Sequence, residues 1–125
     1  KEEMTKRVCK ALENEFVTCL GHPSGRLLPR RDAIQLDWEK VFQTAKDNQK
    51  IMEINSFPER LDLSWQNIKL AKDYKLKFSI DSDSHQQSHF QLLEIGVGYA
   101  RRGWLEAKDV INTLNARDFE RFLKR

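Results

Sequence analysis

The stretch Phe78-Ser79-Ile80-Asp81-Ser82-Asp83-Ser84-His85 runs from an apolar strand pattern into a short acidic turn that ends in a histidine. Asp83 and His85 are two residues apart, so on a continuing strand their side chains would point to the same side. A carboxylate and an imidazole at the C-terminal end of a strand form half of a metal site. Alone, Asp-x-His is more typical of a capped turn after a buried strand, so the rest of the chain must decide.

Two earlier segments repeat this design of an apolar strand followed by polar residues. Residues 16–20 predict a short buried strand that ends in a loop with Gly21, His22 and Pro23. Residues 51–55 predict a second strand, which ends at Asn55, and residues 77–80 predict a third.

Helices are expected between these strands. Asp37 is a good N-cap for a helix with an apolar stripe, and Ser64 is a good N-cap for the next one. The order strand–helix–strand–helix–strand favours an α/β fold with parallel strands. Because parallel strands end at one rim of a sheet, we expect the residues that follow them to lie near one another there, namely His22, Asn55, Asp83 and His85.

Helical patterns also flank this unit at both ends. Residues 2–14 predict an amphipathic helix, and residues 88–95 predict another that Gly96 and Gly98 interrupt. Asn115 is suited to cap a last helix. The side chains of that helix expected to face inward are Phe119, Phe122 and Leu123.

Length and composition place the chain among globular domains. It has 125 residues, 33% charged and 39% hydrophobic, and a net charge of +3 from 22 basic and 19 acidic side chains. That charge is too small to establish nucleic-acid binding.

No apolar run approaches the roughly 20 residues of a membrane span, and we expect no membrane partner. Cys9 and Cys19 lack metal-binding spacing and are expected to be reduced thiols of a cytoplasmic protein. The start at Lys1 is no signal peptide, and we expect a piece of a longer chain.

Two further ionisable side chains, His89 and Glu53, are interpreted from their position in the expected helix and strand. His89 lies one turn into the helix after His85, and its default interpretation is solvated surface. Glu53 alternates with Met52 and Ile54, so it faces the other side of the strand. It is either an acid inside a barrel or a charge at the strand end, and spacing does not decide between them.

Four arginines are candidates for phosphate or DNA contacts, since a guanidinium fork suits phosphate oxygens. Individually, each is as compatible with a surface ion pair. They are Arg26, Arg60, Arg101 and Arg102.

Several ordered motifs resemble one known family. Residues 20–28 (LGHPSGRLL) resemble a motif of the PHP (polymerase and histidinol phosphatase) domain, and Asp83-Ser84-His85 resembles its final metal motif. Residues 54–55 and 60–63 are similar to its next strand and helix entry. Residues 100–105 (ARRGWL), followed by 109–113 (DVINT), resemble the tail of the PHP domain in bacterial family X DNA polymerases.

The resemblance implies a distorted (βα)7 TIM-like barrel with parallel strands, flanking helices and a trinuclear site of zinc, manganese or iron. In family X polymerases the domain is similar to a 3′→5′ exonuclease acting on DNA in repair. On that pattern His22, Asp83 and His85 are metal ligands, one to each metal, and no catalytic residue beyond the metal ligands is implied. The opening His-x-His motif of the family is absent from the sequence. We therefore expect residues 1–125 to be the C-terminal half of a PHP domain, inactive and weakly metal-binding alone, with a tendency to self-associate.

Two other interpretations stay open. The first is a stand-alone PHP phosphatase that acts on a small phosphate ester. The second is a non-catalytic DNA-binding or structural module, in which the turn with Arg101, Arg102 and Trp104 provides the working surface.

Overall fold

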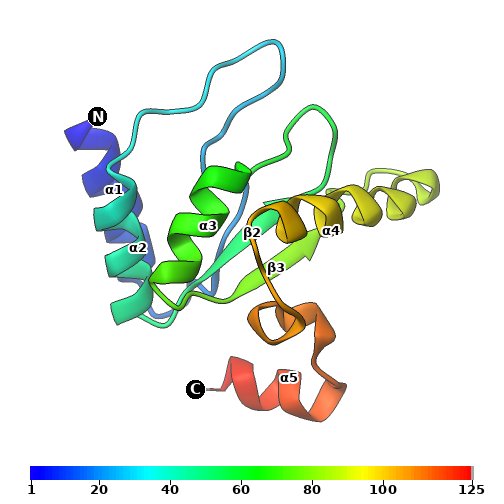
Figure 1. Cartoon of the computed structure of the whole chain (residues 1–125). Helices are drawn as coiled ribbons and strands as arrows, with labels where there is room; N and C mark the ends of the chain where they lie inside the picture. Colours follow the sequence, from blue (N-terminus) through cyan, green and yellow to red (C-terminus); the bar gives the residue numbers. More distant parts are fainter. Residues whose placement is uncertain (125) are drawn as a thin grey trace.

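A computed structural model describes residues 1–124. Its centre is a parallel sheet, as the sequence predicts, and the order of its strands is β1-β2-β3 (Figure 1). The strands are β1 (Cys19–Leu20), β2 (Ile51–Asn55) and β3 (Phe78–Asp81). The expected strand over residues 16–20 is therefore reduced to its last part, and Phe16 is 88% exposed.

Helices precede and connect the strands. They are α1 (Glu2–Leu12), α2 (Trp38–Asp47) and α3 (Trp65–Asp73). The predicted caps are confirmed, because Asp37 accepts a hydrogen bond from the Lys40 N–H and Ser64 accepts one from the Asn67 N–H. Each helix buries a narrow apolar stripe, such as Val41, Phe42 and Ala45 of α2.

The chain after β3 forms short 3-10 turns and two more helices. The elements are η1 (Gln87–Leu92), α4 (Leu93–Arg102), η2 (Ala107–Asp109), η3 (Ile111–Thr113) and α5 (Ala116–Leu123). The predicted interruption at Gly96 and Gly98 is wrong, since both lie inside α4. A Cβ at Gly96 would overlap Ser56 Oγ and Ile80 Cγ2, so this glycine lets α4 lie directly against the sheet.

The two faces of the sheet differ in composition. The strand register places Leu20, Met52, Ile54, Phe78 and Ile80 on one face, and all of them belong to or pack on the apolar core. Figure 1 shows α3 and α4 lying over one face of the sheet. The opposite face, called the open face below, carries mostly polar side chains. Its residues are Cys19, Ile51, Glu53, Asn55, Ser79 and Asp81.

The last helix does not bury its apolar side. Asn115 caps α5 as predicted, by accepting from the Asp118 N–H. The expected inward packing is wrong for Phe119 and Leu123, which are 37% and 48% exposed. A hollow of about 370 Å³ lies between α5 and the end of β3, lined among others by Ser79, Asp81 and Phe119. The apolar side of α5 therefore faces open space near the open face of the sheet.

Candidate functional site

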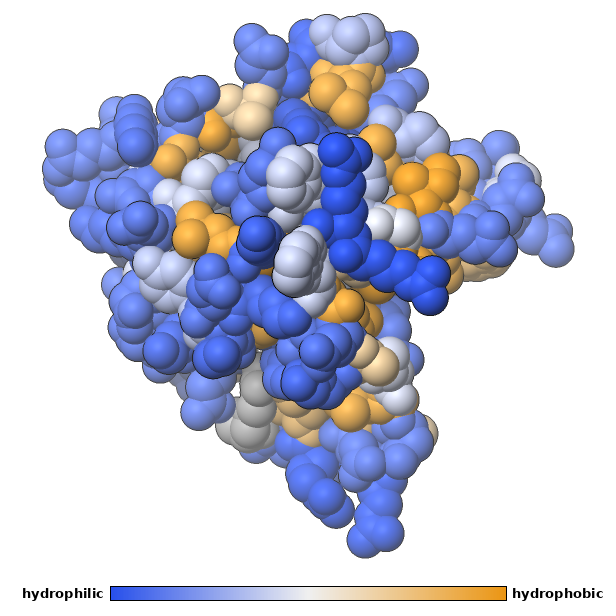
Figure 2. All heavy atoms as spheres, viewed as in Figure 1, coloured by the Kyte–Doolittle hydropathy of each residue, from blue (hydrophilic) through white to orange (hydrophobic). Residues whose placement is uncertain are grey.

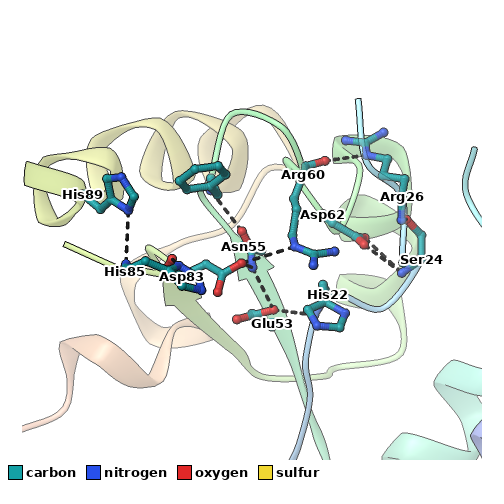
Figure 3. A network of polar contacts seen from close by, with 12 residues as sticks. His22, Ser24, Arg26, Glu53, Asn55, Arg60, Asp62, Asp83, His85 and His89 are labelled. Carbon is teal, nitrogen blue, oxygen red and sulfur yellow. Dashed lines mark hydrogen bonds and ion pairs between the residues drawn. The ribbon is translucent and has the colours of Figure 1, made fainter. Parts of the chain in front are cut away.

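Polar side chains from all three strand ends gather at one rim of the sheet. His22 follows β1, Asn55 ends β2, and Asp83 and His85 follow β3. Figure 3 shows these residues grouped above the ends of the strands, with Glu53 and Arg60 between them. Parallel pairing is the physical cause, because it brings all C-terminal strand ends to the same edge.

Asn55 joins the end of β2 to the turn after β3. Its amide nitrogen donates to Asp83 Oδ2 at 3.2 Å and to Glu53 Oε2 at 3.5 Å. Its side-chain oxygen accepts from the Phe57 N–H at 3.0 Å. The residue is 1% exposed, so these partners replace the water that its amide loses on burial. No motif at the sequence level identified this role.

Asp83 does not lie on a continuing strand. Strand β3 ends at Asp81, and Asp83 has a positive φ of 52°. The expected alternation with His85 is therefore replaced by a turn. Asp83 Oδ2 accepts from both Asn55 and Arg60 Nε, the latter at 3.2 Å. Among residues 1–124, no hydrogen bond is found to the other oxygen, Oδ1.

His85 and His89 form a connected pair. His85 Nδ1 lies 2.7 Å from the Asp83 carbonyl oxygen, and the His85 N–H donates to His89 Nδ1 at 3.2 Å. The His89 ring also packs edge-on against Phe57, with centroids 5.1 Å apart. If His85 Nδ1 carries the proton that the carbonyl accepts, Nε2 is an available metal-ligand lone pair. The default interpretation of His89 as solvated surface is wrong, and its four-residue spacing from His85 was the available signal.

Glu53 lies on the open face, close to His22. Its carboxylate accepts a hydrogen bond from the His22 N–H. Burial raises the pKa of this carboxyl above its ordinary value, and the hydrogen bond from His22 opposes that rise. The alternation of the sequence placed Glu53 on the correct face, and the structure adds that it contacts the loop after β1. The nearby Cys19 thiol has a pKa raised to about 12, mainly by burial and then by Glu53 and Asp81.

Arg26 and Arg60 belong to the same region but have different surroundings. Arg26 Nε donates to the Arg60 carbonyl at 2.8 Å, and its Nη2 donates to the Leu61 carbonyl. This guanidinium therefore holds the loop after β2. Arg60 donates to Asp83 through Nε, while its buried Nη1 has no hydrogen-bond partner among residues 1–124. A pocket of about 150 Å³ lies here, lined among others by Phe57, Arg60, Asp83 and His85.

Asp62 and Ser24 fasten the two loops of the rim together. Both carboxylate oxygens of Asp62 accept from the Ser24 N–H, at 3.1 and 3.0 Å. Asp62 is 0% exposed, and burial raises its pKa above the ordinary value.

Two of the arginines predicted to contact phosphate or DNA, Arg101 and Arg102, lie elsewhere in the fold. They are the last two residues of α4. A few residues later Val110 forms a bridge with Phe78, the first residue of β3. Because the rim lies at the opposite, C-terminal ends of the strands, these arginines lie away from it.

The rim does not supply a complete metal site by itself. Within residues 1–124 no group of three His, Cys, Asp or Glu side chains is arranged to hold a metal ion. The donors present are the free oxygen of Asp83 and the imidazoles of His85 and His22. These chemical types suit zinc or manganese, but three or four converging protein ligands are usual for a tight site.

The chain resembles a polymerase with exonuclease function and a group of phosphatases. It is 35% identical over 96% of its length to a protein of Bacillus subtilis named DNA polymerase/3′-5′ exonuclease PolX, of which it covers 21%. It is 30% identical over 90% of its length to a probable phosphatase of Thermoanaerobacter, of which it covers 46%. No family model matches the chain. The resemblance to the PHP domain of family X DNA polymerases, inferred from the motifs, is confirmed by these relatives. The chain spans less than half the length of each of these two. No helix within the described residues is long and apolar enough to cross a membrane.

Proposed function

We propose that this chain is part of a metal-dependent phosphoesterase domain, of the 3′–5′ exonuclease type, in a family X DNA polymerase that acts in DNA repair. The observation that carries this proposal is the meeting of His22, Asp83 and His85 at one rim, in a chain similar along 96% of its length to a polymerase/exonuclease. The domain would be a distorted barrel, and residues 1–125 its C-terminal half.

The metals would be zinc, manganese or iron. When bound, they would activate a water molecule for attack on a phosphodiester and stabilise the leaving oxygen. His22, Asp83 and His85 would each ligate one of them through His22 imidazole, Asp83 Oδ1 and His85 Nε2. Since no three donors converge within residues 1–124, the remaining ligands would come from outside this chain.

The side chains around these donors orient them. Arg60 and Asn55 hold Asp83 Oδ2 from two sides and leave Oδ1 available. The Asp83 carbonyl fixes the ring of His85, as hydrogen-bonded partners commonly do for ligating histidines. Arg60 lines the pocket, and its Nη1 is a buried donor without a partner among the described residues, so a phosphate oxygen that reached it would satisfy it. The same reasoning does not extend to Arg26, whose guanidinium binds two backbone carbonyls.

Alone, the chain would be inactive. A metal held by a single protein ligand keeps mostly water in its coordination shell, so binding would be weak. The bridged metals that clamp attacking and leaving oxygens could not assemble. The polar open face and the exposed side of α5 are what the other half of the barrel would cover.

A second candidate is a phosphatase that acts on a small phosphate ester. The match to a protein named probable phosphatase, of which the chain covers 46%, favours it. The pocket of about 150 Å³ beside Arg60 would suit a single phosphate group. The two functions differ in substrate rather than in the chemistry of the rim.

The test uses the full-length protein that contains this chain. We expect Asp83→Ala and His85→Ala each to abolish hydrolysis of a 3′-labelled DNA strand and to leave primer extension intact. Asp73→Ala, which removes an exposed carboxylate at the end of α3, is the matched control. Unchanged exonuclease activity in Asp83→Ala would refute the assignment of the site. If the wild-type protein has no exonuclease activity but hydrolyses a small phosphate ester, and if the two variants lose that hydrolysis, the phosphatase would be favoured.

A further inference from the structure

The corner after α4 presents a tryptophan to solvent. Gly103 ends α4 and packs so tightly on α3 that a Cβ would overlap Ile68. Trp104 follows with a positive φ of 66°, a backbone conformation that bulky residues rarely adopt. Its indole is 67% exposed, and its carbonyl oxygen accepts a hydrogen bond from Lys72 Nζ. The backbone is thus held in place while a large aromatic side chain points outward.

Cations lie against this indole and its neighbour. Lys69 Nζ lies 4.8 Å from the centroid of the Trp104 ring. The Arg102 guanidinium carbon lies 4.9 Å from the centroid of Trp65, which starts α3. Arg101 is exposed, and within residues 1–124 its side chain makes no hydrogen bond or ion pair. Together Trp65, Lys69, Arg101, Arg102 and Trp104 form a surface that we call the Trp104 platform.

The acids near this platform are mostly neutralised by other lysines. Asp109 pairs with Lys72 at 3.8 Å, and Glu106 pairs with Lys108 at 2.6 Å. Asp73 lies one turn after Lys69 on α3 without forming an ion pair among the described residues. The platform therefore keeps a positive potential from Lys69, Arg101 and Arg102. Figure 2 shows strongly hydrophilic side chains beside paler ones over α3 and the end of α4.

We propose that the Trp104 platform binds single-stranded DNA, with an unpaired base stacked on the Trp104 indole and phosphates beside the arginines. An exposed aromatic ring among cations is the usual means of binding a single strand, whereas a duplex hides its base faces. A protein-binding hot spot would instead surround its aromatic anchor with apolar neighbours, and the ring contacts here are with Lys69 and Arg102. This inference rests on the proposed function, because it assigns a strand-holding surface to an enzyme whose site lies at the other end of the sheet.

The test measures fluorescence anisotropy of a labelled oligo-dT titrated with the 125-residue chain at several salt concentrations. We expect Trp104→Ala to weaken binding by about 5- to 150-fold, the range of one lost stacking contact, and Trp104→Phe to retain most of it. Phe16→Ala removes an aromatic side chain that is 88% exposed in the segment between α1 and β1, outside the platform, and should change nothing. We expect Arg101→Gln to reduce the slope of log affinity against log salt by about 0.7, whereas Arg117→Gln, which removes the same charge from α5, should not.

Binding that is equal in wild type and Trp104→Ala, with unchanged circular dichroism, would overturn the proposal, as would equal losses in Trp104→Ala and Phe16→Ala. A platform that serves a protein partner would give the first of these results. The outcome is separable from that of the exonuclease test. Loss of hydrolysis in Asp83→Ala with normal DNA binding in Trp104→Ala would support the rim and refute the platform.

Discussion

Arg60 Nε lies 3.2 Å from Oδ2 of Asp83, and this ion pair links the loop after β2 to the turn after β3. Both side chains are partly exposed, at 20% and 31%, so water weakens the attraction. The pair therefore contributes more to the geometry of the rim than to the stability of the fold. It fixes one Asp83 oxygen and holds Arg60, whose Nη1 has no partner within the described part of the chain, at the wall of the pocket.

Replacing Arg60 should impair catalysis more than folding. We expect Arg60→Gln in the full-length protein to lower kcat/KM for phosphoester hydrolysis by about 10- to 100-fold, the worth of a hydrogen bond to a charged group. The matched control is Arg30→Gln, which removes an exposed arginine from the same long loop as Arg26. Steady-state hydrolysis of both variants, with thermal melting of each, measures the effect. Equal activities in the two variants would contradict the role given to Arg60.

The two glycines of α4 offer a comparison within one helix. A Cβ at Gly96 would overlap Ser56 and Ile80, whereas a Cβ at Gly98 meets no atom within 4 Å. We expect Gly96→Ala to destabilise the fold by about 1–3 kcal/mol through overpacking. Gly98→Ala should stabilise it by up to about 1 kcal/mol, because alanine favours helix. Urea unfolding of the two variants decides this, and a similar change in both would show that α4 does not pack as described.

The glycines also show what sequence patterns could predict of the fold. Helix propensity gave the wrong result at Gly96 because propensity describes an isolated helix, and the contact with Ser56 decides this position. The parallel order of the strands and the caps Asp37 and Ser64 were predictable, since alternation and capping act within a few residues. The apolar pattern of α5 was also visible, but not the fact that Phe119 stays 37% exposed.

A buried carboxylate at the rim should make stability depend on pH. Asp62 is 0% exposed, and burial raises its folded-state pKa above the ordinary 3.8. The folded chain then binds its proton more tightly than the unfolded chain, so stability falls as pH rises from 3.8 through the folded pKa. We expect Asp62→Asn to flatten that fall. Unfolding free energies of wild type and variant, measured from this acid range to neutrality, test it, and parallel pH profiles would contradict it.

The candidate site was only partly accessible from the sequence. His22, Asp83 and His85 follow strands, so topology alone grouped them at one rim. The roles of Asn55 and Asp62 depend on contacts across loops, where no period of the sequence applies. The sequence also could not predict which of the four candidate arginines lie at the rim, for a similar reason. Arg101 and Arg102 resemble phosphate ligands in composition, but α4 carries them away from the rim, and only the three-dimensional path of the helix shows this.

Self-association of the isolated chain should proceed through α5 rather than through the strand edges. Half of a barrel would have a free strand edge on each side, but the edge of β3 is occupied. Asn112 donates to the Ile80 carbonyl at 2.9 Å and accepts from the Ile80 N–H at 2.8 Å, so its side chain occupies that edge. Strand β1 spans only Cys19–Leu20, which offers little for pairing. Phe119 and Leu123 of α5, in contrast, leave apolar surface uncovered beside the hollow.

The last prediction follows from that surface. Burying apolar area is worth about 25 cal/mol per Å², so a second copy that fills the hollow beside α5 would gain several kcal/mol from a few hundred Å². We expect light scattering to show a dimer of the 125-residue chain, and Phe119→Gln with Leu123→Gln to return it to a monomer. Phe90→Gln removes another exposed aromatic side chain, from η1, and should leave the dimer intact. A wild-type chain that stays monomeric at high concentration would show that no surface drives association, and a dimer that survives the α5 changes but not Phe90→Gln would show that another surface does.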